Sequence, residues 1–184
     1  MEKYIIFLRG INISGKNKIE MKKLKEETIK LGYFNVSTYL NSGNLILSSN
    51  IDNKNEIKNS IDKMIKNKFN LDIPIFIIKQ EELKDLLDNK PGFCKENDKE
   101  IYNNIIFIIK PCTYEEVYKE LGTPDKKLEK IKEYNNNIYW SYNLKDYRKS
   151  IWWKNTASKD IRNKITIRTY NTVKKVLELC EESI

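Results

Sequence analysis

Short apolar runs alternate with stretches of helical spacing along this chain, and their order is the feature that most limits its fold. In the first half the order is strand, helix, strand, strand, helix, strand, and a turn at residues 41–44 joins the two middle strands as a hairpin. The six elements are expected at residues 4–8, 20–31, 36–40, 45–48, 57–65 and 73–78. This order predicts the split βαβ, or ferredoxin-like, plan.

The second half shows the same order again, after a short helix at residues 83–87 and a junction near residues 90–100. Its elements are expected at residues 102–109, 114–121, 128–134, 138–142, within 145–163 and at 165–167. The spacing in 128–134 fits a helix equally well, and only the repeated order favours a strand there. We therefore expect an α+β fold: a tandem of two ferredoxin-like (βαββαβ) subdomains, residues 1–90 and 100–184, with an additional C-terminal helix.

Local signals define two helices of the second half. Thr113 and Glu116 form a capping-box pattern before the helix at 114–121. The C-terminal helix places Cys180 on its apolar face, and either Asn171 or Thr172 is expected to cap it. Cys180 is therefore expected in the core.

The sequence contains no histidine and three cysteines. Without histidine, Ser-His-Asp and Cys-His catalysis and every His-containing metal site are excluded. Cys94, Cys112 and Cys180 match neither a CxxC pair nor a disulfide framework, which predicts a reducing compartment. The apolar run at 4–8 is too short for a secretory signal, and no run approaches the roughly 20 residues of a membrane span. We expect a cytoplasmic protein with no membrane contact, no metal and no cofactor.

The formal net charge of +8 comes from one segment. Residues 145–175 hold ten basic and two acidic residues, while the rest of the chain is neutral. Tyr147, Trp152, Trp153 and Tyr170 are interleaved with these cations, a combination typical of a phosphate-rich or single-stranded nucleic-acid partner. The alternative is that the aromatic side chains are core and the lysines a solvated face. The chain's 30 lysines, beside 27 isoleucines and 22 asparagines, make lysine number alone weak evidence for nucleic acid.

Residues 10–17 spell G-x-x-x-x-G-K directly after a strand, which nearly matches a P-loop. Asn17 stands where a P-loop has its magnesium-binding Ser or Thr, and no later strand ends in the Asp that would hold the metal. The antiparallel order is also wrong for a P-loop enzyme. Two readings of the loop remain. In the first, the backbone N–H groups of the loop, the N-terminus of the following helix and the charges of Arg9 and Lys16 bind an anion. In the second, Gly10 and Gly15 only permit a tight turn.

In the split βαβ plan, the loop after the first strand and the hairpin between the second and third strands emerge on the same rim of the sheet. Arg168 and the basic segment of the second half are candidate walls for a ligand held there. The candidate ligand-binding residues are Arg9, Gly10, Asn12, Gly15, Lys16, Asn17, Ser42, Asn44 and Arg168.

Four segments carry a resemblance to a known family. They are FLRGIN at 7–12, GKNKI at 15–19, TYLNSGN at 38–44 and TIRTYNTV at 166–173. Together they resemble the bacterial uncharacterised family catalogued as domain of unknown function 1697, in order along essentially the whole chain. The resemblance implies a tandem of two ferredoxin-like subdomains and no established reaction, substrate or cofactor. The family pattern more often has Gly where Ser14 stands, and Arg-Asn before an aromatic where Arg168 and Thr169 precede Tyr170.

These residues favour a non-catalytic protein that binds a phosphate-bearing small molecule or another anionic ligand at the rim. One alternative is nucleic-acid binding through residues 145–175. A second is an enzyme of unknown reaction in the same cleft, whose acid–base group would be Lys, Tyr, Cys or a carboxylate. A third is an interaction module that exposes Trp152 and Trp153, although paired tryptophans in a small domain more often pack internally.

Overall fold

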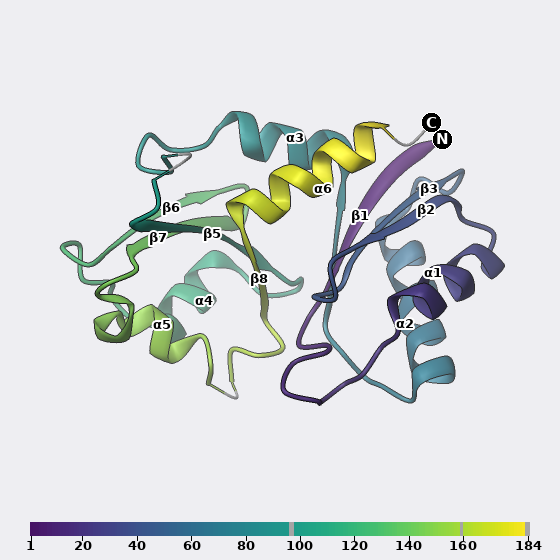
Figure 1. Ribbon diagram of the computed structural model, residues 1–184, viewed down its shortest axis with the longest axis horizontal. Helices are drawn as coiled ribbons and strands as arrows, with labels where there is room; N and C mark the ends of the chain where they lie inside the picture. Colours follow the sequence, from purple (N-terminus) through teal and green to yellow (C-terminus); the bar gives the residue numbers. More distant parts are fainter. Residues whose placement is uncertain (96–97, 159, 183–184) are drawn as a thin grey trace. The chain divides into compact units, whose positions relative to one another are not determined.

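The computed structural model describes residues 1–95, 98–158 and 160–182, which form two compact units (Figure 1). Unit 1 comprises Met1–Lys84 and the chain from Lys175 onward, and unit 2 comprises Asp85–Lys174. Each unit holds one four-stranded antiparallel sheet, so the fold is mixed α+β, as the sequence predicts. No helix in the described ranges is long and apolar enough to cross a bilayer.

Unit 1 has the strand order β2-β3-β1-β4, with every neighbouring pair antiparallel. Its elements are β1 (Glu2–Leu8), α1 (Met21–Lys30), β2 (Phe34–Tyr39), β3 (Asn44–Ser49), α2 (Lys54–Phe69) and β4 (Ile75–Lys79). Strand β1 is central and its residues from Tyr4 to Leu8 are fully buried, as expected for a strand that is apolar on both faces. Tyr4 shares a core cluster with Leu24 of α1 and Ile61 of α2, and Figure 1 shows both helices on the same face of this sheet.

Unit 2 has the strand order β6-β7-β5-β8, again antiparallel throughout. Its main elements are β5 (Ile101–Ile108), α4 (Tyr114–Leu121), β6 (Glu129–Tyr134), β7 (Asn137–Asn143), α5 (Ile151–Asn155) and β8 (Ile165–Thr169). The strand prediction for β6 is confirmed, because it pairs with β7 along its length and places Ile131 opposite Trp140. The capping box of Thr113 and Glu116 is also confirmed. The helical stretch expected within 145–163 is short, a 3-10 turn at Tyr147–Lys149 followed by α5.

Two helices, α3 (Gln80–Asp88) and α6 (Tyr170–Glu182), include residues of both units. The cap predicted for α6 is wrong: Thr169, at the end of β8, accepts the N–H of Thr172 at 3.2 Å, so the helix begins before Asn171. Cys180 is fully buried, as predicted, and burial raises the pKa of its thiol to about 11. This cysteine is therefore a neutral core residue at physiological pH.

A buried carboxylate organises the interior of unit 2. Glu129 is 2% exposed, and its Oε2 accepts hydrogen bonds from Trp140 Nε1 at 2.9 Å and from Ser150 Oγ at 2.6 Å. These bonds join the edge strand β6 to β7 and to the residue that caps α5. Trp152 is also fully buried, with its Nε1 donating to the Gly122 carbonyl at 2.7 Å. Packing is therefore the role of this tryptophan.

Replacement of Glu129 by alanine leaves the indole N–H of Trp140 and the hydroxyl of Ser150 without their acceptor. We expect E129A to lower the free energy of unfolding by about 3 kcal/mol, because two buried donors are left without a hydrogen-bond acceptor. Urea denaturation followed by tryptophan fluorescence measures this loss. Lys132 is exposed on the same strand and supplies the control, since K132A should change stability by about 0.5 kcal/mol at most. Equal losses in the two variants would contradict the role assigned to Glu129.

Candidate functional site

The loop between β1 and α1 contains a two-residue turn at its tip. The N–H of Lys16 donates to the Ile13 carbonyl at 2.9 Å, and the two central residues, Ser14 and Gly15, have φ of 48° and 76°. Positive φ at both central positions is the signature of a type I′ turn. Helix α1 begins only at Met21, so the G-x-x-x-x-G-K segment does not open a helix as a P-loop does. The loop therefore differs from a P-loop in its geometry as well as in its sequence.

Asn12 ties this loop to the neighbouring hairpin. Its Nδ2 donates to the carbonyls of Ile19 at 2.9 Å and Asn41 at 3.0 Å, and its Oδ1 accepts the N–H of Ile19 at 2.8 Å. Asn41 lies in the turn between β2 and β3. The backbone of Asn12 has φ of 54°, a left-handed conformation that asparagine adopts more readily than most residues. This side-chain amide therefore links the loop to the hairpin and to the segment that precedes α1.

Two other predicted site asparagines are also engaged within the loop and the hairpin. Asn17 Nδ2 donates to the Gly10 carbonyl at 3.0 Å. Asn44 is buried, and its Nδ2 donates to the Tyr39 carbonyl at 2.7 Å and to Ser42 Oγ at 3.2 Å. These contacts favour a bracing role for the asparagines, and ligand binding by them stays a prediction.

The backbone of the loop also meets the backbone of the hairpin. Leu8 donates its N–H to the Gly43 carbonyl at 2.8 Å. A Cβ atom on Gly43 would lie 2.8 Å from Leu8 Cβ and 2.9 Å from Ile11 Cδ1, so only glycine fits there. Residues 9–19 and 41–44 thus form one continuous edge of unit 1, which we call the rim.

Positive charge remains at the surface of the rim. Lys16 and Lys18 are exposed, and neither takes part in an ion pair within the part of the chain that the structure describes. Arg9 is partly buried, and its backbone N–H donates to the Pro74 carbonyl at 2.9 Å. Pro74 itself precedes β4, which begins two residues later than predicted.

Eight of the nine predicted site residues lie in the rim of unit 1. Arg168, the ninth, belongs to β8 of unit 2 and is 8% exposed. Its Nη1 donates to Thr166 Oγ1 at 2.9 Å and to the Ile167 carbonyl at 2.8 Å. This arginine thus contacts its own strand, and a role as a wall of a ligand site stays a prediction.

Much of the positive charge in residues 145–175 is compensated locally. Lys159 lies outside the described residues. Four of the lysines form ion pairs: Lys145 with Glu100, Lys149 with Asp146, Lys164 with Glu120 and Lys175 with Glu178. The segment is therefore not a uniformly free cationic surface, although its sequence carries all of the net charge.

One exposed aromatic cluster remains in this segment. Trp153 is 42% exposed, and its ring lies 5.0 Å from that of Tyr147 in an edge-on arrangement. The Arg148 guanidinium lies over the Tyr147 ring at 5.6 Å, and its Nε donates to the Tyr147 hydroxyl at 3.0 Å. The exposed indole and the guanidinium are each groups of the kind that stack on bases, although the nearly perpendicular Trp153 and Tyr147 rings do not form one flat surface.

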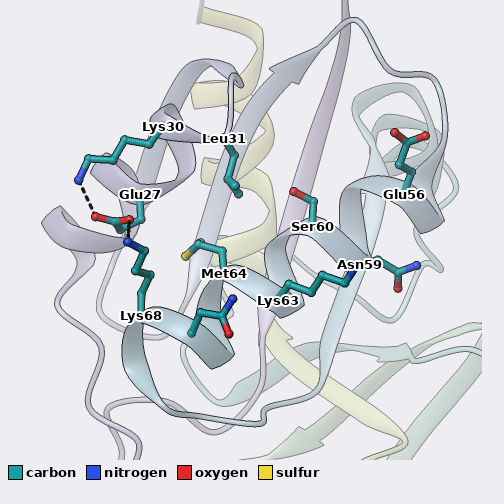
Figure 2. A pocket seen from close by; sticks show the side chains of 10 residues that line it. Glu27, Lys30, Leu31, Glu56, Asn59, Ser60, Lys63, Met64 and Lys68 are labelled. Atoms are coloured by element: carbon teal, nitrogen blue, oxygen red, sulfur yellow. Dashed lines mark hydrogen bonds and ion pairs between the residues drawn. The ribbon is translucent and has the colours of Figure 1, made fainter.

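A groove between α1 and α2 was not foreseen from the sequence. It has a volume of about 610 Å³, and the buried Glu27 carboxylate lies at one end of it (Figure 2). Glu27 Oε1 accepts from Lys30 Nζ at 2.6 Å, and Oε2 pairs with Lys68 Nζ at 3.2 Å. The hydrogen bond from Lys30 lowers the pKa of the Glu27 carboxyl, and the same bond raises the pKa of Lys30. In the sequence, Glu27 and Lys30 are three residues apart, a spacing that is common for ion pairs on the surface of a helix. Lys68 belongs to α2, so no pattern of neighbouring residues predicts that it joins this pair.

No group of three or more His, Cys, Asp and Glu side chains able to hold a metal ion occurs among the described residues. Cys94 and Cys112 are free thiols, and burial raises the pKa of both. Neither thiol therefore has the lowered pKa of a catalytic nucleophile.

Comparison with known proteins supports the resemblance. The model of a family described as "Protein of unknown function (DUF1697)" matches residues 1–139. A solved structure, described as that of conserved bacterial protein SP0830 from Streptococcus pneumoniae, is similar with a TM-score of 0.85 and 24% sequence identity. The likeness covers 97% of this chain and 98% of that chain, and at this identity it shows the fold alone. No curated protein matches the sequence.

The bracing role of Asn12 predicts a stability difference between two asparagines that both have positive φ. Asn35 has φ of 48°, and its side chain makes one long hydrogen bond, to Ser48 Oγ at 3.5 Å. N12A and N35A share the backbone cost of alanine in a left-handed conformation, but only N12A loses three short bonds. We expect N12A to lose about 2 kcal/mol more than N35A in urea denaturation. If the two variants unfold at the same urea concentration, the loop is held by something other than Asn12.

Proposed function

The chain belongs to the DUF1697 family of proteins of unknown function, and we propose from its own residues that it binds a phosphate-bearing or other anionic ligand at the rim of unit 1. The observation that carries this proposal is the exposed ammonium of Lys16 on a turn that Asn12 holds in place. In the described residues no carboxylate neutralises Lys16 or Lys18. Their charge is therefore available to a ligand.

The backbone of the turn adds neutral donors to this charge. Ser14 and Gly15 are exposed, and no acceptor for their N–H groups is found in the described part of the chain. A type I′ turn bonds only the N–H of its last residue internally, so the two central N–H groups are directed to solvent. Because internal bonds already fix the loop, a ligand loses little free energy in ordering it.

We further propose that both units are ferredoxin-like and that the chain is a tandem of this plan, with subdomains 1–90 and 100–184. The support is the strand order, β2-β3-β1-β4 in unit 1 and β6-β7-β5-β8 in unit 2. In each sheet the strand that comes first along the chain, β1 or β5, lies between the third and the fourth. The loop with glycines and free lysines occurs in the first half, whereas Lys110, Pro111 and Cys112 stand at the matching place in the second. The two halves are therefore proposed to share a plan and to differ in function.

A second candidate function, single-stranded nucleic-acid binding by unit 2, rests on Trp153. A base can stack on its partly exposed indole, and Arg148, over the neighbouring Tyr147 ring, places a cation nearby. Lys154 adds an exposed cation on the same short helix. Lys145 and Lys149 nearby are already paired with carboxylates, so less of their charge is available to a nucleic acid. Anion binding at the rim of unit 1 is therefore the stronger proposal.

The rim proposal predicts that inorganic pyrophosphate stabilises the protein through Lys16. A ligand present at 100 times its Kd adds about 2.7 kcal/mol to the apparent free energy of unfolding. We expect a thermal-shift titration to show weaker pyrophosphate binding in K16A, by about tenfold, or 1.4 kcal/mol. The control is K25A, which removes an exposed lysine from α1. An equal response in both variants, or none in the wild type, would refute the proposal.

For the second candidate, W153A should weaken binding of a 15-residue oligothymidylate by about 1 to 3 kcal/mol, because one stacked base loses its platform. Fluorescence anisotropy at low and moderate salt measures this affinity and its salt dependence. I151A removes an apolar side chain of similar exposure from the same helix and should leave the affinity within about twofold. Loss of the same size in I151A would assign the effect to the helix rather than to the indole.

A further inference from the structure

The groove between α1 and α2 carries a pair of lysines fixed by a buried carboxylate. Figure 2 shows the Lys30 and Lys68 side chains approaching Glu27 from two sides. Glu27 has a side-chain exposure of 9%, against 66% for Lys30 and 51% for Lys68. The carboxylate is thus hidden while both ammonium groups face solvent.

This arrangement leaves hydrogen-bond donors unused. An ammonium group has three N–H donors, and each lysine of the pair meets one oxygen of Glu27. The remaining donors point away from the carboxylate, on two cations that Glu27 keeps close together. Lys63 adds a third exposed cation to the groove, with no ion pair within the described residues. Glu56, at the other end of the groove, is its one exposed carboxylate (Figure 2), so the three lysines leave the lining with a net positive charge that carboxylates of a partner complement.

The rest of the groove selects among anionic partners. Met64 lies in its floor, and Leu31, at the end of α1, is 43% exposed beside it. Helices α1 and α2 together carry nine lysines and four acidic residues, and neither contains an arginine. The groove lining includes no aromatic side chain on which a base could stack. An occupant with carboxylates and apolar side chains fits this combination better than a nucleic acid.

We propose that the α1–α2 groove docks an acidic peptide segment of a partner protein. Carboxylates of the segment bind the exposed ammonium groups of Lys30, Lys63 and Lys68, and an apolar side chain covers Leu31 and Met64. Two helices supply a groove of the kind that receives an extended or helical peptide. This inference is independent of anion binding at the rim, since it uses different residues.

A labelled peptide tests the proposal on the full chain. The probe is a fluorescein-labelled 12-residue peptide of repeated Glu-Glu-Leu, with a matched peptide in which glutamine replaces every glutamate. The critical variant is K30Q with K68Q, because glutamine keeps an N–H donor for Glu27 while it removes the charge. The control is K25Q with K66Q, which removes the same charge from exposed positions of the same two helices outside the groove. K63Q and L31S are single changes at side chains that form no ion pair.

We expect anisotropy titrations to show about tenfold weaker binding in K30Q/K68Q and about threefold weaker binding in K63Q and in L31S. The control pair should stay within about twofold of the wild type. The proposal is overturned if K25Q/K66Q loses as much as K30Q/K68Q, if the glutamine peptide binds equally well, or if neither peptide binds. It is also overturned if a 15-residue oligothymidylate displaces the peptide through the same lysines. K16A should bind the peptide as the wild type does, which separates this result from that of the rim.

Discussion

The side-chain amide of Asn12 is the contact on which the organisation of unit 1 around its rim depends. Its three hydrogen bonds connect the loop after β1, the segment before α1 and the hairpin between β2 and β3. Gly43, packed closely against Leu8 and Ile11, adds a second link between the loop and the hairpin. The loop held by these contacts carries the exposed N–H groups of Ser14 and Gly15 next to the exposed side chain of Lys16. In the proposed function, this preorganised backbone lowers the free-energy cost of holding an anion beside Lys16.

Buried glutamates have different consequences in the two units. Glu129 Oε2 accepts hydrogen bonds from two neutral donors, those of Trp140 and Ser150, in the interior of unit 2. Glu27 lies just beneath the surface of unit 1 and is bonded by two lysines, whose charges it leaves exposed. The same side chain thus stabilises a core in one unit and arranges surface cations in the other. Its neighbours, more than its own burial, decide which role it has.

The order of strands and helices was predictable because each element carries its own period and its own terminal signals. The capping box before α4 and the central, doubly covered β1 were read from a few adjacent residues. The weak β6 was predicted only through the repeated order, and its pairing with β7 confirms it. The cap of α6 was missed because Thr169 belongs to a strand and still caps the following helix. Helix ends depend on such side-chain geometry and are less visible in sequence than helix faces.

The site was less predictable than the fold, because its contacts join distant residues. The sequence predicted that the loop and the hairpin lie on one rim. It could not show that the Asn12 side chain donates hydrogen bonds to the carbonyls of Ile19 and Asn41. The Glu27–Lys68 pair links two helices and leaves no local pattern. A titration of isotope-labelled protein with pyrophosphate, followed through backbone amide NMR shifts, tests the central claim most directly. Saturable shifts at Ser14, Gly15 and Lys16 that disappear in K16A are the predicted result; unmoved amides at the turn, with shifts elsewhere in the chain, would contradict it.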